Sequence, residues 1–146
     1  MKGQKPQGIA YLIGRADHML SRILRNRLKS KRLTTSQYTM LSILNTHGQT
    51  SNAKLAERSL MTPQSANEQV KNMEAEGWIQ RAPDQSHGRI INLALTETGT
   101  GLLEDCDELV SELEAKMLSH FEPQDKEQMQ RLLRLLIKGL HDLDTQ

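Results

Sequence analysis

Aromatic side chains are scarce in this sequence, at 3% of 146 residues. Strands favour aromatic and β-branched side chains, so the composition argues against an all-β fold. Hydrophobic residues of all kinds reach 36%, which leaves leucine, isoleucine and methionine to fill the core. A chain of this length fits one domain that can bury such a core. We therefore expect a mainly helical domain.

Cysteine is nearly absent, and long apolar runs are missing. A single cysteine, Cys106, excludes an intrachain disulfide and makes a reducing compartment the default. No apolar stretch approaches the roughly 18 residues that indicate a membrane helix. The polar start, Met1 to Gly8, lacks the apolar segment of a signal peptide. We expect a soluble, cytoplasmic protein with no membrane partner.

The sequence also lacks the patterns of an enzyme or a metal site. It has no glycine-rich phosphate loop, and no group combines a nucleophile, a base and an orienting residue. Cys106 falls on an apolar helical stripe, which is typical of a buried structural thiol. The histidines form no His-x-x-x-His pair and no set with a cysteine pair, so we expect no metal and no cofactor. They are His18, His47, His87, His120 and His141.

Acidic and basic residues are nearly equal in number but lie in different parts of the chain. Residues 1–32 hold nine basic residues and one acidic residue, whereas residues 101–146 hold five basic and eleven acidic residues. The net charge of +1 therefore combines a basic first segment with an acidic last one. Such asymmetry permits local attraction to phosphate without a basic average.

Two short helices are predicted near the middle of the chain. Ser51 is a good N-cap for a helix over residues 52–58. Thr62 caps the second helix after a short break. Pro63 holds the first position of that helix, where a missing N–H costs nothing.

The second helix separates apolar from polar side chains. Ala66, Val70 and Met73 recur at helical spacing and are expected to face inward. The outward side chains can mostly donate and accept hydrogen bonds, which suits base edges in a major groove. The amides of Gln64 and Asn67 can each bond adenine N6 and N7 as a pair. The outward set is Gln64, Ser65, Asn67, Glu68, Lys71 and Asn72.

A β-hairpin is predicted directly after this helix. Gly77 ends the helix, residues 78–81 and 89–95 have strand patterns, and the polar segment 82–88 forms the turn. Two helices followed by a hairpin form a winged helix-turn-helix, and this pattern predicts DNA binding.

Further amphipathic helices flank the winged unit. One runs from a cap at Thr34, Thr35 or Ser36 to His47, and its expected inner face is Tyr38, Leu41, Ile43 and Leu44.

Three longer helices carry more apolar surface than one small module can cover. We expect a second copy of the chain to bury it through a two-fold interface. The basic face of the first helix is either a solvated surface or a flank that touches DNA backbone or a partner chain. The apolar stripe of the helix after Thr96 includes Leu102 and Cys106. The three helices cover residues 9–28, 97–117 and 124–144.

Four segments occur in this order and spacing: LTTSQYTML (33–41), LA (55–56), MEAEGWIQR (73–81) and LTETG (95–99). Together they resemble the MarR family of bacterial transcription regulators. The resemblance spans roughly residues 9–143 and implies a six-helix winged subunit whose terminal helices form a homodimer interface. It also implies a recognition helix in each of two successive major grooves of a pseudo-palindrome, with wings in the minor groove.

The sequence departs from the family at three points. The family usually has Asp-x-Arg before the last wing strand, where residues 87–89 are His-Gly-Arg. Arg89 is kept, and its wing is expected to be looser or steadied by Asp84 instead. Glu68 stands where the family often has a basic residue, and its carboxylate repels phosphate. Leu60 fills a turn position that the family often gives to glycine.

The resemblance also implies a ligand. Relatives take small, often phenolic or lipophilic anions in a cleft between the first, second and fifth helices. Such a ligand would shift the spacing of the two recognition helices and release the operator. The residues expected to line the cleft are Arg15, His18, Met19, Tyr38 and Met40.

These observations predict a mainly α fold with a small β-wing and a dimeric, DNA-binding repressor. Residues 1–32 would hold the basic arm and first dimerisation helix, residues 33–99 the winged helix-turn-helix, and residues 100–146 the C-terminal dimerisation helices. The alternative is a winged-helix protein-interaction module without specific DNA binding. The predicted contacts to double-stranded DNA are Ser51, Lys54, Thr62, Pro63, Gln64, Ser65, Asn67, Lys71 and Arg89.

Overall fold

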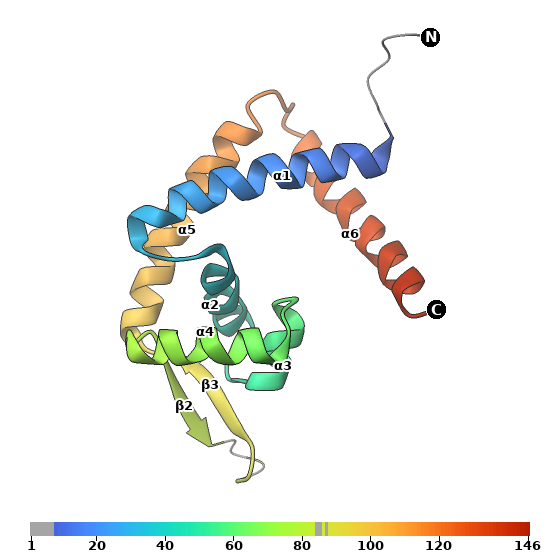
Figure 1. Cartoon of the computed structure of the whole chain (residues 1–146). Helices are drawn as coiled ribbons and strands as arrows, with labels where there is room; N and C mark the ends of the chain where they lie inside the picture. Colours follow the sequence, from blue (N-terminus) through green and yellow to red (C-terminus); the bar gives the residue numbers. More distant parts are fainter. Residues whose placement is uncertain (1–7, 84–85, 87) are drawn as a thin grey trace, which may run out of the picture. The chain divides into compact units, whose positions relative to one another are not determined.

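Helices dominate the computed structural model, which describes residues 8–83, 86 and 88–146. The predicted mainly α fold with a small β-wing is confirmed (Figure 1). The chain divides into two compact units, Met1–Val110 and Ser111–Gln146, and the functional division at residues 32 and 99 stays a prediction. Among the described helices, none is both long and apolar enough to cross a membrane. The elements are α1 (Ile9–Leu28), η1 (Lys29–Lys31), α2 (Thr35–His47), β1 (Thr50–Ser51), α3 (Asn52–Arg58), α4 (Pro63–Ala75), β2 (Ile79–Pro83), β3 (Ile91–Leu95), α5 (Glu97–Met117) and α6 (Asp125–Asp144).

Side-chain caps start α2, α3 and α4 where the sequence predicts. Thr34 Oγ1 accepts from the Gln37 N–H and Gln37 Oε1 accepts from the Thr34 N–H, each at 3.1 Å, which completes a capping box. Ser51 caps α3 by accepting from the Lys54 N–H at 3.3 Å. Thr62 caps α4 in the same way. These bonds satisfy N–H groups that a first helical turn leaves without partners, so local sequence sets the boundaries.

A third strand joins the predicted hairpin. β1 is two residues long and pairs with β3, giving the antiparallel order β1-β3-β2. A strand this short shows no alternation that the sequence could reveal. The hairpin strands differ from the predicted bounds because their pairing runs from Ile79–Leu95 to Pro83–Ile91.

The core of the first unit is centred on α2, which contacts α1, α3 and β3. All four residues of the predicted inner face of α2 pack in or against the core, but Tyr38 and Ile43 are only half-buried. Gln37 and Met40, outside that predicted face, are buried. A helix with neighbours on several sides buries more than one stripe, and Gln37 tolerates burial because the capping box satisfies its side-chain oxygen.

Thr96 holds the start of α5 against the turn between α4 and β2. Its N–H donates to the Trp78 carbonyl at 3.0 Å, and its hydroxyl donates to the Gly77 carbonyl. The same Oγ1 accepts from the Gly99 N–H at 3.0 Å, which caps the helix. A Cβ on Gly99 would lie 2.0 Å from the Trp78 oxygen, so a side chain there would displace backbone. The LTETG segment therefore fixes where the wing leaves the helices.

Leu60 closes the turn between α3 and α4. Its N–H donates to the Glu57 carbonyl at 3.2 Å, and the Met61 N–H donates to the Ala56 carbonyl at 3.0 Å, which is a Schellman motif. The φ of Leu60 is +57°, a left-handed conformation that a β-carbon makes costly. The side chain is 95% exposed, so little packing compensates for this strain.

Replacing Leu60 by glycine should stabilise the fold. Loss of the β-carbon relieves about 1–2 kcal/mol of strain in the folded state. The greater conformational freedom of glycine in the unfolded chain lowers the free energy of unfolding by about 0.5–1 kcal/mol. We expect the free energy of unfolding to rise by up to about 1 kcal/mol in urea titrations. Leu60→Ala keeps the β-carbon and is the control. If the glycine variant is no more stable than the alanine variant, the β-carbon does not strain the backbone at Leu60.

Cys106 is wholly buried in α5, as predicted. Leu103 is buried with it, whereas Leu102 of the predicted stripe is only half-buried. Burial raises the pKa of the Cys106 thiol, nearby carboxylates add to the rise, and Lys31 opposes it. The reactive thiolate is therefore scarcer than in an exposed cysteine at the same pH.

A disulfide reagent at pH 8 should modify Cys106 at least about 100-fold more slowly in the folded protein than in urea, because the sulfur is reached only when α5 opens. Raising the pH above 8 should speed the reaction of the folded protein more steeply than that of a free thiol, because a thiol of higher pKa is still mostly protonated there and keeps gaining thiolate. The reagent's absorbance follows the reaction. The Cys106→Ser variant gives the blank, and equal rates in both states would show that the thiol is accessible.

Candidate nucleic-acid interface

α4 presents a polar face to solvent because its apolar face is locked into the core. Ala66, Val70 and Met73 are each 0% exposed, as their spacing predicts. Leu55 and Ala56 of the neighbouring α3 are buried as well. α4 lies beside α3 and contacts β2 of the hairpin (Figure 1). The exposed residues of α4 include the predicted outward set: Gln64, Ser65, Asn67, Glu68, Lys71 and Asn72.

The remaining predicted helix contacts surround the first turns of α3 and α4. Ser51 and Thr62 use a hydroxyl oxygen for capping, and each hydroxyl proton can still be donated to an acceptor such as phosphate. Lys54 and Pro63 are exposed next to these caps. The first turn of a helix carries partial positive charge, which favours anions. The structure thus brings these four residues to the helix ends that attract a phosphate backbone.

Asn67 has a partner that the sequence does not indicate. The Asn52 Nδ2 group, from the first residue of α3, donates a hydrogen bond to Asn67 Oδ1. The two residues are 15 positions apart, so only the packing of α3 on α4 brings them together. The acceptor half of the Asn67 amide is therefore engaged within the protein.

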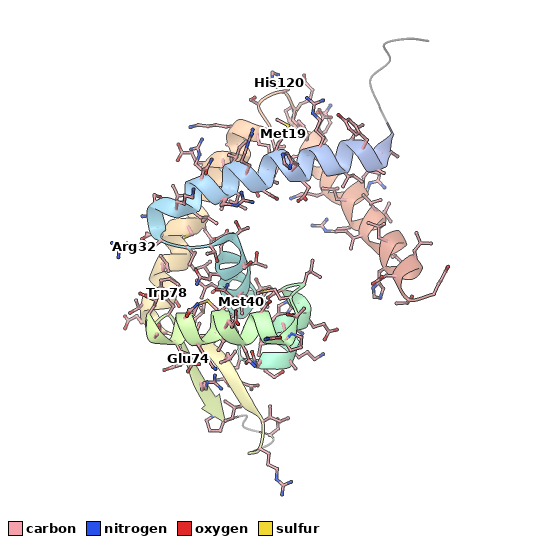
Figure 2. The ribbon with its side chains drawn as sticks, in the orientation of Figure 1. Met19, Arg32, Met40, Glu74, Trp78 and His120 are labelled. Carbon is pink, nitrogen blue, oxygen red and sulfur yellow. The ribbon has the colours of Figure 1, made fainter. Side chains whose placement is uncertain are left out.

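An ion pair links the end of α4 to the wing. Arg81 Nε and Nη2 each lie 2.9 Å from Glu74 Oε1, and the hydrogen bond to Glu74 raises the pKa of the guanidinium. Glu74 lies in the last turn of α4, close to the Trp78 turn (Figure 2). Both charges fall in the MEAEGWIQR segment, where opposite charges flank a glycine turn. That signal could have predicted the pair, and sequence reasoning missed it.

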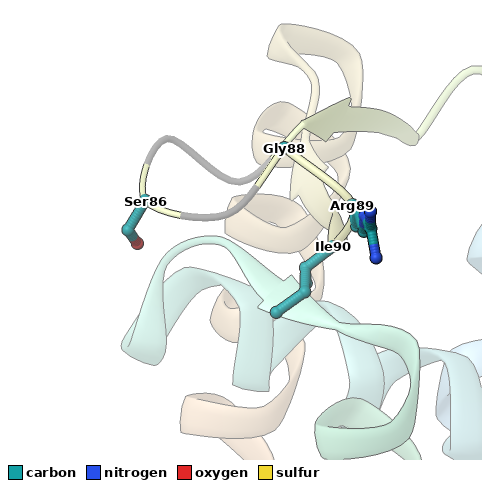
Figure 3. A pocket seen from close by; sticks show the side chains of 4 residues that line it. All are labelled: Ser86, Gly88, Arg89 and Ile90. Carbon is teal, nitrogen blue, oxygen red and sulfur yellow. The ribbon is translucent and has the colours of Figure 1, made fainter.

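Arg89 lies at the exposed tip of the wing. It borders a surface hollow with Ser86, Gly88 and Ile90, and its side chain projects away from Ser86 (Figure 3). The proposed effects of His87 and Asp84 on Arg89 lie outside the described residues. The structure places Arg89 on the hairpin and the outward polar residues on α4, so the predicted DNA contacts lie on two different elements.

The predicted ligand residues are not brought into one open group. Arg15, His18 and Met19 are exposed on α1, whereas Met40 is 0% exposed within the core. Tyr38 is half-buried on α2 and its hydroxyl donates to Asp107 Oδ1 at 2.7 Å. Burial raises the pKa of Tyr38, and the hydrogen bond to Asp107 raises it further. Tyr38 therefore stays a neutral phenol that is already bonded, and the ligand assignment stays a prediction.

Comparison with known proteins points to one family. The model of the MarR family matches residues 33–91, which contain the helix-turn-helix and most of the wing. The chain is 26% identical to the HTH-type transcriptional repressor IacR of Pseudomonas putida over 135 residues, covering 92% of this chain and 79% of IacR. It is also 26% identical to the HTH-type transcriptional repressor Rv2887 of Mycobacterium tuberculosis, covering 88% of this chain and 92% of that protein.

Solved structures show the same fold along most of the chain. A MarR family transcriptional regulator from Silicibacter pomeroyi superposes with a TM-score of 0.84 at 25% identity, covering 92% of this chain and 90% of that chain. The MepR–DNA complex of Staphylococcus aureus superposes with a TM-score of 0.78 at 22% identity, covering 91% and 96%. Sequence pattern, helix-turn-helix geometry and these comparisons agree: residues 33–91 match the MarR family, and the chain has the fold of its winged helix-turn-helix regulators.

Proposed function

We propose that this protein is a sequence-specific transcriptional repressor that binds a pseudo-palindromic operator. The observation that carries the proposal is the polar face of α4, which is exposed while Ala66, Val70 and Met73 are fully buried. A rigid helix with a solvated amide-rich face fits a major groove. The names of IacR and Rv2887 as repressors, and the MepR–DNA complex among the similar structures, support the same function.

The proposed contacts to DNA are contacts to phosphates, to the minor groove and to base edges. Ser51, Lys54 and Thr62, at the starts of α3 and α4, would hold phosphates and set the register. Arg89 on the wing would enter a minor groove, whose narrow A·T-rich form attracts arginine. Glu68, exposed on α4, opposes the phosphate field and can accept a bond from cytosine N4. The base-reading residues would be Gln64, Ser65, Asn67 and Lys71.

A homodimer would place two recognition helices on the two half-sites. α6 has no buried residue in the described chain, although it is strongly amphipathic. Its apolar side chains include Ile137 and Leu140, which are 64% and 54% exposed. Ile9 and Leu12 on α1 are also 71% and 50% exposed. Apolar faces of this extent are unusual on a monomer, and an isologous interface would cover them.

A small phenolic or lipophilic anion is the proposed signal that releases the operator. Arg15 and His18 on α1 offer positive charge or hydrogen-bond donors, and Met19 beside them offers apolar contact. Met40 is buried, so in this conformation it would pack beneath the residues of such a site and would not touch the ligand. We propose a cytoplasmic location, where an operator is accessible.

Gln64→Ala should relax the preference at one base pair in each half-site, because an amide bonded to adenine N6 and N7 contributes about 1–3 kcal/mol of discrimination. Arg89→Ala should instead weaken binding most to operators with A·T-rich flanks. Selection from a randomised operator library, followed by sequencing, measures both. Gln128→Ala on α6 is the matched control. If the Gln64→Ala variant keeps every wild-type base preference and Arg89→Ala keeps its affinity for all flanks, the proposed interface is wrong.

Ile137→Asp combined with Leu140→Asp should convert the dimer to a monomer or an unfolded chain, because two carboxylates cannot be buried without partners. Light scattering on a sizing column at micromolar concentration measures the mass. Lys138→Asp introduces the same group at an exposed polar position of α6 and should stay dimeric. A wild-type monomer at this concentration would exclude the proposed assembly.

A further inference from the structure

Within the described part of the chain, Asn67 is the one predicted base-reading residue whose side-chain amide is held by another residue. Asn67 is exposed on the groove face of α4, and its Oδ1 accepts a hydrogen bond from Asn52 Nδ2. A free asparagine amide offers one acceptor and two donor hydrogens, and it can pair with both N6 and N7 of adenine. That pairing needs Oδ1 to face the base. In this structure Oδ1 faces Asn52 instead, which leaves Nδ2 as the group available to DNA.

The position of Asn52 is itself fixed. Asn52 is the first residue of α3, whose start is set by the Ser51 cap and whose Leu55 and Ala56 are buried. Asn52 Oδ1 is buried and has no hydrogen-bond partner among the described residues, so this amide makes its side-chain bond through Nδ2. Because α3 and α4 are packed together, the backbones of the two residues stay close, and the hydrogen bond can break only by a change of side-chain rotamer.

We propose that Asn52 is a positioning residue that makes Asn67 a donor-only reader of DNA. A donor-only side chain prefers a base whose major-groove edge offers acceptors. Guanine offers N7 and O6 side by side, and thymine offers O4. Adenine offers one acceptor next to a donor, and the cytosine edge offers a donor. Asn67 should therefore select guanine or thymine at its base pair. This inference rests on the proposed DNA-binding function and adds the base class that α4 recognises.

Asn52→Asp gives the sharpest test because it removes the donor and keeps the shape. A carboxylate accepts only, so the Asn67 amide should turn to donate Nδ2 to it and present Oδ1 to the base. The preferred base should change from guanine or thymine to adenine or cytosine, which offer an amino group. An acidic side chain in the first turn of a helix is favourable, so α3 should keep its structure.

Two further variants complete the series. Asn52→Ala frees the Asn67 amide to face either way, and the preference should relax so that adenine is accepted as well. Asn67→Ala should abolish the preference at that base pair. Ala53→Asp is the matched control: it adds the same charge at the next, exposed position and should weaken binding to all sequences without changing the preferred base.

The readout is base preference at each operator position, from selection on a randomised library and sequencing. Wild type should favour guanine or thymine at one position by about 5- to 10-fold, the lower part of the range for specific base contacts. Asn52→Asp should reverse this preference, an effect that a purely structural role of Asn52 cannot produce. Reversal by Asn52→Asp but not by Ala53→Asp establishes the positioning role.

Failure of the inference on Asn52 gives a different result from failure of the proposed function. If Asn67→Ala changes one base pair while both Asn52 variants keep the wild-type preference there, Asn52 does not position Asn67 and the proposed function stands. If the Asn67→Ala variant keeps all the wild-type base preferences, the inference is wrong, whatever the Asn52 variants do. If Gln64→Ala and Asn67→Ala both keep every preference, α4 does not read bases and the proposed function falls too.

Discussion

The burial of one apolar stripe on α4 is the constraint on which the winged unit depends. Ala66, Val70 and Met73 have no exposure to solvent. A helix turns by about 100° per residue, so a shift of one position would carry polar residues such as Asn67 into the core without partners. The packing of the apolar stripe therefore fixes which side chains of α4 are exposed. The proposed use of this exposed face in DNA recognition would then follow from a requirement of the fold itself.

Backbone turns and polar contacts then connect that helix to its neighbours. Leu60 and Gly77 take left-handed conformations at the two turns that precede and follow α4. Thr96 ties the second turn to α5, and the Glu74–Arg81 pair ties the end of α4 to β2. Exposed ion pairs add little stability, but a hydrogen bond from Nε and a close contact from Nη2 to one carboxylate oxygen favour one angle between helix and strand. Such a restriction would favour the proposed action of α4 and the wing on one DNA.

The terminal helices differ from this unit in how they bury apolar surface. The core around α2 is complete within the first unit, where Met40 and Leu41 are fully buried. In the described chain α6 buries none of its residues, and α1 buries only Leu28. The stability of a protein with such faces depends on its concentration if a second copy covers them. DNA binding would then be coupled to assembly, because two half-sites need two recognition helices.

The sequence by itself determined the order of elements, their caps and which face of α4 is polar, because these depend on residues a few positions apart. Thr62, Pro63 and the Ala66-Val70-Met73 spacing specify α4 without knowledge of the fold. Only the tertiary structure decided that Gln37 and Met40 of α2 are fully buried while Tyr38 and Ile43 are half-buried, since α2 has neighbours on several sides. The two-residue strand β1 likewise exists only because β3 lies beside it. The bond between Asn52 and Asn67 also depends on tertiary structure, because the packing of two helices brings together amides that the chain separates by 15 residues.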